Sequence, residues 1–287
     1  MSLTEVSRSA PSQVDTGSGL SHRAIDPSHR RDVRNHSKSE VAYADRLSEY
    51  LPLKSRMDRI FGFILFVLAS PLILVLAMIV RLTSTGEAIY RQTRVGKDGK
   101  TFELLKLRSM VRDAETPGNP VWCSVNDLRI TRVGRILRKL HLDELPQLWN
   151  VAKGEMSLVG PRPERPEICQ NLVDEIDDYH SRHRVKPGIT GLSQINLPAD
   201  QTIEDVRRKQ ILDLRYIEEA NLWLDVRMIM ATALRTVGIS GEIVIKLMNL
   251  SRREYLQEQE ASNHSQNRET KHTFESVQSA ESPRFPR

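Results

Sequence analysis

The sequence predicts a mostly helical α+β protein, with a re-entrant membrane helix followed by a small cytosolic domain that carries a short β-hairpin and interfacial helices. Three observations support this fold class. Residues 60–80 form one uncharged apolar run, residues 88–107 read as two strand-like stretches around a Gly/Asp turn, and the later segments mix apolar residues with arginine. Apolar periodicity and turn residues are the main signals of secondary structure in a single sequence.

Four regions follow from the composition of the 287 residues. Residues 1–53 and 251–287 are rich in polar residues and poor in large apolar ones, so we expect two disordered tails. The re-entrant helix is expected over 54–82, and the cytosolic domain over 83–250. Because the residues before Lys54 are polar, we expect no additional N-terminal transmembrane bundle.

Net charge and cysteine content narrow the class of protein. A net charge of +5 and a pI near 9.3 indicate an anionic partner, such as nucleic acid, a phospholipid surface or a phosphorylated substrate. Cys123 and Cys169 are too few for a disulfide framework or a zinc site, which fits a reducing cytosolic environment.

The apolar run Ile60–Val80 is long enough to cross a hydrocarbon core of about 30 Å. It begins too far from the N-terminus for a cleaved signal peptide and is longer than most buried soluble helices. At its midpoint, Ser70-Pro71 removes the backbone hydrogen bond to the carbonyl of Val67 and favours a kink.

Positive residues flank both ends of this run, so the positive-inside rule selects neither side for a crossing helix. They are Lys54, Arg56 and Arg59 before it, and Arg81, Arg91, Arg94 and Lys97 after it. A helix that bends at Ser70-Pro71 and returns leaves both ends in the cytoplasm, and we favour this re-entrant interpretation. A kinked transmembrane helix is the alternative.

The next segment, AIYRQTRVGKDGKTFELLKLRSM, predicts a hairpin with its turn at Gly96–Gly99 and a second strand ending near Leu107. This hairpin brings Lys106 and Arg108 together. Both could simply be charges on a solvated edge strand. The arginine-rich run RITRVGRILRKL that follows fits an amphipathic helix on anionic lipid, and it ends just before an acid pair.

The acid pair Asp143-Glu144 in HLDELPQLWN has two interpretations. Asp143 could merely cap a helix that has Pro146 in its first turn and Gly154 at its end. Alternatively, the pair is reactive, because cationic residues surround it in the sequence. Arg162 lies in the stiff Gly-Pro-Arg-Pro stretch and has the planar fork that suits bidentate phosphate binding.

Motif order decides between these interpretations. The Ser-Pro-containing apolar run, KLRSM, RITRVGRILRKLHLDELPQLWNV, GEMSLVGPRPE and VKPGITGL together resemble the bacterial sugar transferases, the monotopic phosphoglycosyl transferases. The resemblance covers roughly residues 54–237. The chain departs from the family pattern at Leu107, Leu128, His141 and Ser193, none of which is in the acid pair.

This resemblance implies transfer of a sugar 1-phosphate from a UDP-sugar to undecaprenyl phosphate, with Mg²⁺ as cofactor and UMP as the second product. It implies that Asp143 is the nucleophile, that Glu144 and Asp143 hold the metal, and that Ser70-Pro71 is the re-entrant break. The phosphate-binding residues would be Lys106, Arg108, Arg138 and Arg162.

The implied location is the cytoplasmic face of a bacterial inner membrane, at the first membrane step of exopolysaccharide, capsule, O-antigen or glycoprotein glycan synthesis. The sequence does not identify the UDP-sugar or the oligomeric state, and a homodimer is one of the open alternatives.

Two other functions stay open at this point. A membrane-tethered basic protein that binds nucleic acid or anionic lipid would explain the charge but not the acid pair, and 5% aromatic residues argue against a nucleic acid partner. A phosphatase with an aspartyl-phosphate would release its product into water, whereas a membrane segment favours a lipid acceptor.

Overall fold

The computed structural model describes residues 27–112, 114, 127–198, 200–259 and 261. The chain divides into two compact units, Met1–Ala44 and Asp45–Arg287, and the elements below belong to the second unit apart from the start of the first helix. The outer parts of both predicted tails, residues 1–26 and 262–287, lie outside the described residues.

Helix α1 spans Pro27–Thr83 and so begins upstream of the expected start at Lys54. At the other end, residues 253–259 are helical, and Leu256 is buried. The predicted tail boundaries therefore miss helix on the inner side of both tails.

The part of α1 from Glu49 to Thr83 is long and apolar enough to cross a membrane, and only 11% of its most apolar stretch is buried inside the protein. A helix of the soluble core would be mostly buried, because apolar side chains leave water on folding. This exposure agrees with the prediction of a membrane segment at residues 60–80.

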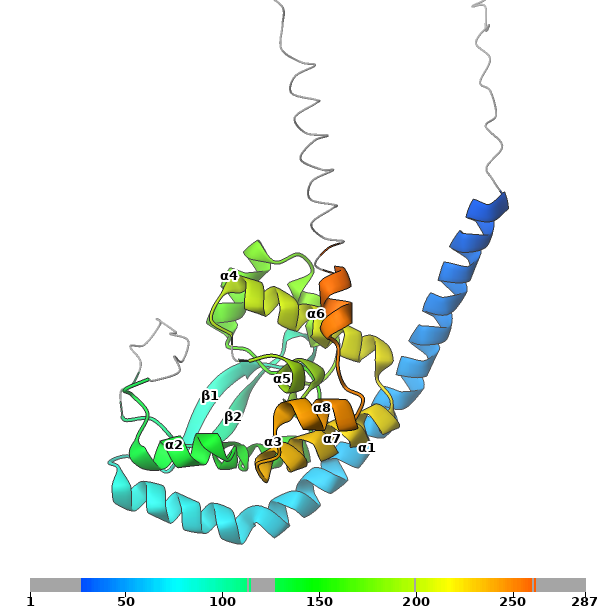
Figure 1. The fold of residues 1–287 in the computed structure, drawn as a ribbon. Coiled ribbons are helices and arrows are strands. Elements are labelled where there is room, and N and C mark those ends of the chain that lie inside the picture. The colour runs from blue at the N-terminus through cyan, green and yellow to red at the C-terminus, as the bar shows by residue number, and fades with distance from the viewer. Residues whose placement is uncertain (1–26, 113, 115–126, 199, 260, 262–287) are drawn as a thin grey trace, which may run out of the picture. The chain divides into compact units, whose positions relative to one another are not determined.

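The helix stays continuous through Ser70-Pro71, and Figure 1 shows that α1 changes direction in its light-blue part, below the domain. Pro71 has no N–H to donate to the carbonyl of Val67. The hydroxyl of Ser70 donates to that carbonyl instead, at 2.8 Å. The Ser-Pro pair therefore permits a bend without leaving this carbonyl unpaired, as polar groups in lipid require.

Buried polar contacts join α1 to the domain. Lys54 Nζ lies 2.5 Å from Asp225 Oδ2, and the hydroxyl of Tyr216 donates to the other oxygen of Asp225 at 2.9 Å. Farther along α1, Gly62 passes so close to Val151 that a Cβ at Gly62 would lie 2.7 Å from Val151 Cγ1. A larger side chain at position 62 would therefore force the two helices apart.

The predicted hairpin is confirmed. Strands β1 (Ile89–Val95) and β2 (Thr101–Leu107) pair antiparallel around the short 3₁₀ turn η1 (Lys97–Gly99), with Tyr90 opposite Lys106. The side chain of Asn150 holds this hairpin, because its Oδ1 accepts from the Leu105 amide at 3.1 Å and its Nδ2 donates to the Glu103 carbonyl at 2.6 Å.

The remaining elements are mostly helical, as predicted. They are α2 (Arg132–Lys139), η2 (Leu142–Glu144), α3 (Gln147–Lys153), β3 (Ser157–Val159), α4 (Pro166–Glu175), η3 (Tyr179–Arg184), β4 (Gly188–Thr190), α5 (Leu192–Asn196), α6 (Ile203–Glu219), α7 (Leu222–Thr236) and α8 (Gly241–Leu247). Strands β3 and β4 form a short parallel pair that the sequence did not reveal.

Helix α7 has a buried apolar face and further apolar residues that are exposed. Leu224, Met228 and Ala231 are buried in the largest core cluster, together with residues of β3, α5, α6 and α8. Outside this buried face, Trp223 is 69% exposed and Met230 is 49% exposed. The buried face therefore contributes to the core of the domain, while Trp223 and Met230 lie outside it.

Candidate active site

The acid pair lies in the tight turn η2, between α2 and α3. His141 enters this turn in the left-handed conformation, with φ of 53°. The capping prediction for Asp143 is wrong, because the residue at the N-cap of α3 is Pro146. Proline suits that place since helix N-termini leave amides unpaired and proline has none. Gly154 does end α3 in the left-handed conformation, as predicted.

Glu144 is held by two cations from different parts of the chain. Arg162 Nη2 lies 2.7 Å from Glu144 Oε1, and Lys106 Nζ lies 3.4 Å from the same oxygen. Burial alone would raise the pKa of Glu144, but Arg162 and Lys106 hold it well below the usual range of a glutamate. Glu144 therefore stays ionised throughout the physiological pH range.

Asp143 is buried, with 7% of its surface exposed. Burial and the neighbouring charge of Glu144 raise its pKa, while the charges of Lys106, Arg138 and Arg162 oppose this rise. A desolvated carboxylate is a stronger nucleophile than one covered by water, and nearby cations keep the ionised form accessible. The turn thus contains one firmly ionised acid and one whose ionisation depends on its surroundings.

The surroundings of Lys106 also shift its pKa. Burial lowers its pKa to about 8, although Glu144 works in the opposite direction. Burial therefore makes the ammonium group of Lys106 easier to deprotonate than that of an ordinary lysine.

Five residues were predicted to share a site with Asp143, namely Glu144 and the four phosphate-binding cations. The structure brings four of them together. Lys106, Arg162 and Glu144 are in direct contact, and the charge of Arg138, in the last turn of α2, acts on Asp143. Arg108 is placed differently. Its Nη2 donates to the Ser84 carbonyl at 2.9 Å and to the Ser84 hydroxyl at 2.8 Å, just after α1.

The loop that carries Arg162 has a fixed backbone. Gly160 is packed so tightly that a Cβ there would lie 2.4 Å from the Lys186 carbonyl. The Gly160 amide donates to the Thr190 carbonyl, and the Gly188 amide donates to the Pro161 carbonyl, both at 2.9 Å. Strand β4 therefore holds the loop from its N-terminal side, which explains why the sequence places glycine and proline here.

Sequence reasoning missed a buried charge network behind the loop. Glu164 contacts Lys209 at 2.6 Å and Arg94 at 3.7 Å, and Arg182 contacts Asp213 at 2.6 Å. Only one signal could have indicated it. Lys209 and Asp213 stand four residues apart on α6, among apolar positions that face the core.

The donor set at the acid pair fits a magnesium ion. Among the residues that the structure describes, no group of three or more His, Cys, Asp and Glu side chains gathers as a metal site. Asp143 and Glu144 offer two carboxylates, and Mg²⁺ is usually bound by one or two carboxylates together with water and substrate phosphates. A site that is completed by a phosphorylated substrate therefore needs no third protein ligand.

Comparison with known proteins places this cluster in a family. Residues 49–238 match the family model described as bacterial sugar transferase. The chain belongs to the bacterial sugar transferase family. The matched range of this sugar transferase contains the apolar part of α1, the hairpin, the acid pair and the loop with Arg162, so the resemblance drawn from the motifs is confirmed.

Three curated relatives carry related names. The chain is 40% identical over 197 residues to "Undecaprenyl-phosphate glucose phosphotransferase" of Komagataeibacter xylinus, covering 67% of this chain and 37% of that protein. It is 41% identical over 206 residues to "UDP-N-acetylgalactosamine-undecaprenyl-phosphate N-acetylgalactosaminephosphotransferase" of Aeromonas hydrophila, covering 70% and 48%.

The third relative is "UDP-glucose:undecaprenyl-phosphate glucose-1-phosphate transferase" of Klebsiella pneumoniae, 42% identical over 180 residues, covering 62% of this chain and 38% of that protein. This sugar transferase thus spans less than half the length of each of the three. Their names include two different sugars, so relatedness alone does not select the sugar.

Proposed function

We propose that this sugar transferase moves a sugar 1-phosphate from a UDP-sugar to undecaprenyl phosphate, giving undecaprenyl-diphosphate-sugar and UMP. The observation that carries the proposal is the buried Asp143 next to Glu144, with Lys106, Arg138 and Arg162 around the pair. Such a cluster combines a nucleophile with cations that can balance phosphate charge. The names of the three relatives support the same reaction.

In the proposed first step, a carboxylate oxygen of Asp143 attacks the β-phosphorus of the UDP-sugar. The bond from this phosphorus to the bridging oxygen breaks, and UMP leaves with the electron pair. In the second step, a phosphate oxygen of undecaprenyl phosphate attacks the same phosphorus. The bond to Asp143 then breaks, and the free carboxylate is restored.

The neighbouring residues would bind and orient the phosphates. Arg162 and Lys106 can contact phosphate oxygens while still facing Glu144, and Arg138 adds positive charge on the side of Asp143. Asp143 and Glu144 would hold Mg²⁺, which supplies charge neutralisation to the phosphates when bound. Arg108 lies against Ser84, so we assign it to the support of the hairpin rather than to direct contact with phosphate.

The exposed apolar residues favour a membrane location. Along α1 they include Phe61, Phe63, Leu68, Leu74 and Met78; in α7 and α8 they include Trp223, Met230, Ile243 and Leu247. Figure 1 shows α2, α3, α7 and α8 on the side of the domain along which the bent part of α1 runs. We infer that α1 is re-entrant and that α7 and α8 lie at the membrane interface, on the cytoplasmic face of the inner membrane.

The alternative of a basic lipid-binding protein is supported by the exposed cations Arg132, Arg135 and Lys139 of α2. Beside the exposed Ile136, they suit anionic headgroups. They would serve equally well to seat an enzyme at the bilayer, whereas lipid binding alone gives no use for the buried Asp143. The transferase therefore accounts for more of the structure.

The test of the proposed function is UMP release from a panel of UDP-sugars, measured with the full chain in detergent or nanodiscs with Mg²⁺ and undecaprenyl phosphate. We expect one or a few UDP-sugars to yield UMP and a lipid-linked product in equal amounts, and chelation of Mg²⁺ to stop both. Absence of UMP release with every donor would reject the proposal.

The pH dependence of this activity follows from two side chains. Because the pKa of Asp143 is raised, its nucleophilic carboxylate is lost at a higher pH than for an ordinary aspartate as the pH falls. As the pH rises through about 8, Lys106 loses its charge and phosphate binding weakens. We expect a bell-shaped profile of kcat/KM whose basic limb lies near pH 8, and Lys106→Arg should move that limb to higher pH.

The topology of α1 can be tested by cysteine labelling in intact cells. Cys123 and Cys169 are first replaced by Ser, and single cysteines are introduced at the exposed positions Glu49 and Thr85. If α1 is re-entrant, an impermeant maleimide added outside reaches neither site until the cells are opened. Labelling of one site in intact cells would instead establish a crossing helix. Pro71→Ala should favour the crossing form, because it restores the straight helix.

A further inference from the structure

We propose that Arg182 is a positioning residue for the transfer reaction: it fixes the backbone of Arg162 so that the Arg162 guanidinium meets Glu144, and Asp213 and Ser193 hold Arg182 in turn. The inference rests on the proposed function, since it assigns a role in the same site to residues that touch neither the acid pair nor, by our assignment, the substrate.

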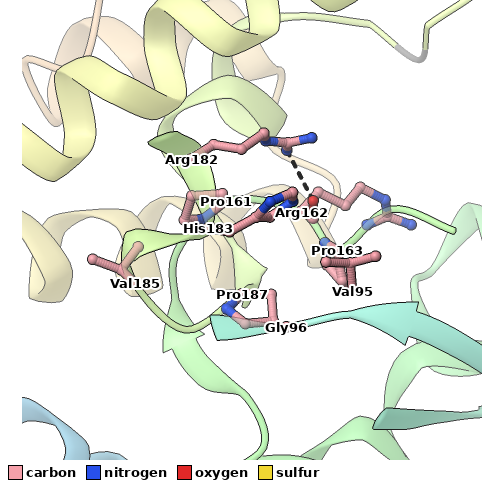
Figure 2. Close-up of a pocket in the computed structure, with 9 residues that line it drawn as sticks. All are labelled: Val95, Gly96, Pro161, Arg162, Pro163, Arg182, His183, Val185 and Pro187. Atoms are coloured by element: carbon pink, nitrogen blue, oxygen red, sulfur yellow. Dashed lines mark hydrogen bonds between the residues drawn. The ribbon is translucent and has the colours of Figure 1, made fainter. Parts of the chain in front are cut away.

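Arg182 is buried, with 2% of its surface exposed. Its Nη2 donates to the Arg162 carbonyl at 2.9 Å, the contact drawn as a dashed line in Figure 2. The same nitrogen lies 2.6 Å from Asp213 Oδ2, and Nη1 donates to the Tyr179 hydroxyl at 2.6 Å. Burying a guanidinium is costly even when it is paired in this way, so the pair adds little to the stability of the fold. We therefore attribute to Arg182 a role in fixing the geometry of the loop.

The contact with Arg162 is one of three on successive carbonyl groups. The Pro163 carbonyl accepts from Arg94 Nη1 at 2.9 Å, and the Glu164 carbonyl accepts from the Val95 amide at 2.8 Å. Prolines at 161 and 163 cannot donate backbone hydrogen bonds, so this loop cannot be fixed by a regular ladder of its own. Its carbonyls are fixed from outside, and Arg182 supplies the contact at the residue that carries the functional side chain.

The contact of the Arg162 guanidinium with Glu144 explains why the Arg162 backbone has to be held in place. Its Nη2 lies 2.7 Å from Glu144 Oε1, whereas Lys106 is 3.4 Å from that oxygen. A displacement of the Arg162 backbone by about 1 Å would lengthen the closer contact beyond a charge-assisted hydrogen bond, and misplacements of this size can cost about 10²-fold in rate. Arg182 thus acts on the acid pair through Arg162.

Ser193 completes the chain of contacts. Its hydroxyl donates to Asp213 Oδ1 at 2.6 Å, so each carboxylate oxygen of Asp213 has its own partner. Ser193 is itself 1% exposed and follows directly after Leu192 of the main core cluster, which anchors the hydroxyl. The sequence departs from the family pattern at this position, and the structure gives the departing residue a definite contact.

The test is a double-mutant cycle on kcat/KM for UMP release with Arg182→Lys, Arg162→Lys and the double variant. Lysine keeps the buried charge but is shorter and ends in a single nitrogen, whereas arginine uses Nη1 for the Tyr179 hydroxyl and Nη2 for the Arg162 carbonyl and Asp213. We expect Arg182→Lys to lower kcat/KM by about 10- to 100-fold. In the Arg162→Lys background the same change should cost less than about 3-fold, because the group that it positions is already gone. Full multiplication of the two losses would overturn the proposal.

Arg227→Lys is the matched control. Arg227 also uses its guanidinium to hold loop carbonyls, at Met248 and Asn249, but these follow α8 and do not lead to Arg162. We expect a comparable fall in Tm and little change in kcat/KM. If Arg182→Lys affects kcat/KM no more than this control does, Arg182 is only structural. Should Arg182→Lys fail to fold, Ser193→Ala is expected to lower kcat/KM in the same direction by about 3- to 10-fold, and an unchanged value would reject the proposal.

Hydrogen–deuterium exchange separates failure of this proposal from failure of the proposed function. The peptide that covers residues 157–166 should exchange faster in Arg182→Lys than in wild type, and should be unchanged in Arg227→Lys, with no substrate present. Unchanged exchange in Arg182→Lys would overturn the positioning role even if the wild-type chain is an active transferase. Faster exchange in a chain that releases no UMP would support the contact while rejecting the reaction.

Discussion

Asp143→Asn is expected to lower turnover by about 10⁴-fold or more, the size of effect seen when an enzyme loses its nucleophile. The carboxamide has almost the same shape as the carboxylate, so the turn η2 and the ion pairs of Glu144 with Arg162 and Lys106 should persist. It carries no negative charge, however, and cannot form the bond to phosphorus. The loss should therefore appear in kcat, with binding of the UDP-sugar largely retained.

Asp178→Asn provides the control for this variant. Asp178 stands in the left-handed conformation directly before η3, as His141 does before η2, and its carboxylate accepts from the Ser181 hydroxyl. An amide oxygen can accept the same hydrogen bond, so activity should stay near the wild-type level. UMP release and circular dichroism of both variants check the expectation. Substantial activity in Asp143→Asn would return Asp143 to a purely structural role.

The gathering of cations around the acid pair could be predicted because its signal is local. Asp143-Glu144 stands between an arginine-rich run and a glycine- and proline-fixed arginine, and these features are visible in the sequence without a fold. The hairpin was equally accessible, since the Gly96–Gly99 turn residues and the flanking β-prone residues specify it. The cap assignment failed because a left-handed residue at His141 and a 3₁₀ turn moved the start of α3 beyond Asp143.

Apart from the spacing of Lys209 and Asp213 on α6, nothing in the sequence indicated the buried network, because its members come together only through tertiary packing. Arg182 and Asp213 are 31 residues apart, and Arg94 lies 69 residues from the carbonyl of Pro163 to which it donates. Nothing in the composition distinguishes these arginines from surface ones. The hydrogen bond of Arg182 to the Arg162 carbonyl is the kind of contact that only coordinates can reveal.

The tail boundaries were misplaced for a related reason. Few large apolar residues precede Lys54, yet Tyr50 donates to Asp225 at 2.6 Å and so ties the helix to the domain before the apolar run begins. After residue 250, Arg252 pairs with Glu219 at 2.9 Å, and the guanidinium of Arg215 lies over the ring of Tyr255. Polar and cation–π contacts of this kind hold helices that hydropathy alone does not reveal.

The second large effect concerns the order of the two chemical steps. If Asp143 holds the phosphosugar between substrates, UDP-sugar and Mg²⁺ without lipid should release up to about one equivalent of UMP per active site. A water-soluble donor and a lipid acceptor then use one site in turn, and the site never has to hold both bulky anions. Because Asp143 is 7% exposed, water has limited access to the bond between Asp143 and phosphorus in the covalent intermediate.

Rapid-quench measurement of UMP and intact-protein mass spectrometry test this expectation together. Wild-type protein should gain the mass of one sugar phosphate, and Asp143→Asn should gain none. Undecaprenyl phosphate added afterwards should discharge the adduct into lipid-linked sugar, which shows that the adduct is competent rather than a side product. A direct transfer gives a different result: UMP appears only once the lipid is present, and no adduct is trapped at any time. In that case Asp143 would help to bind the metal and orient the phosphates, and the attacking oxygen would come from the phosphate of the lipid.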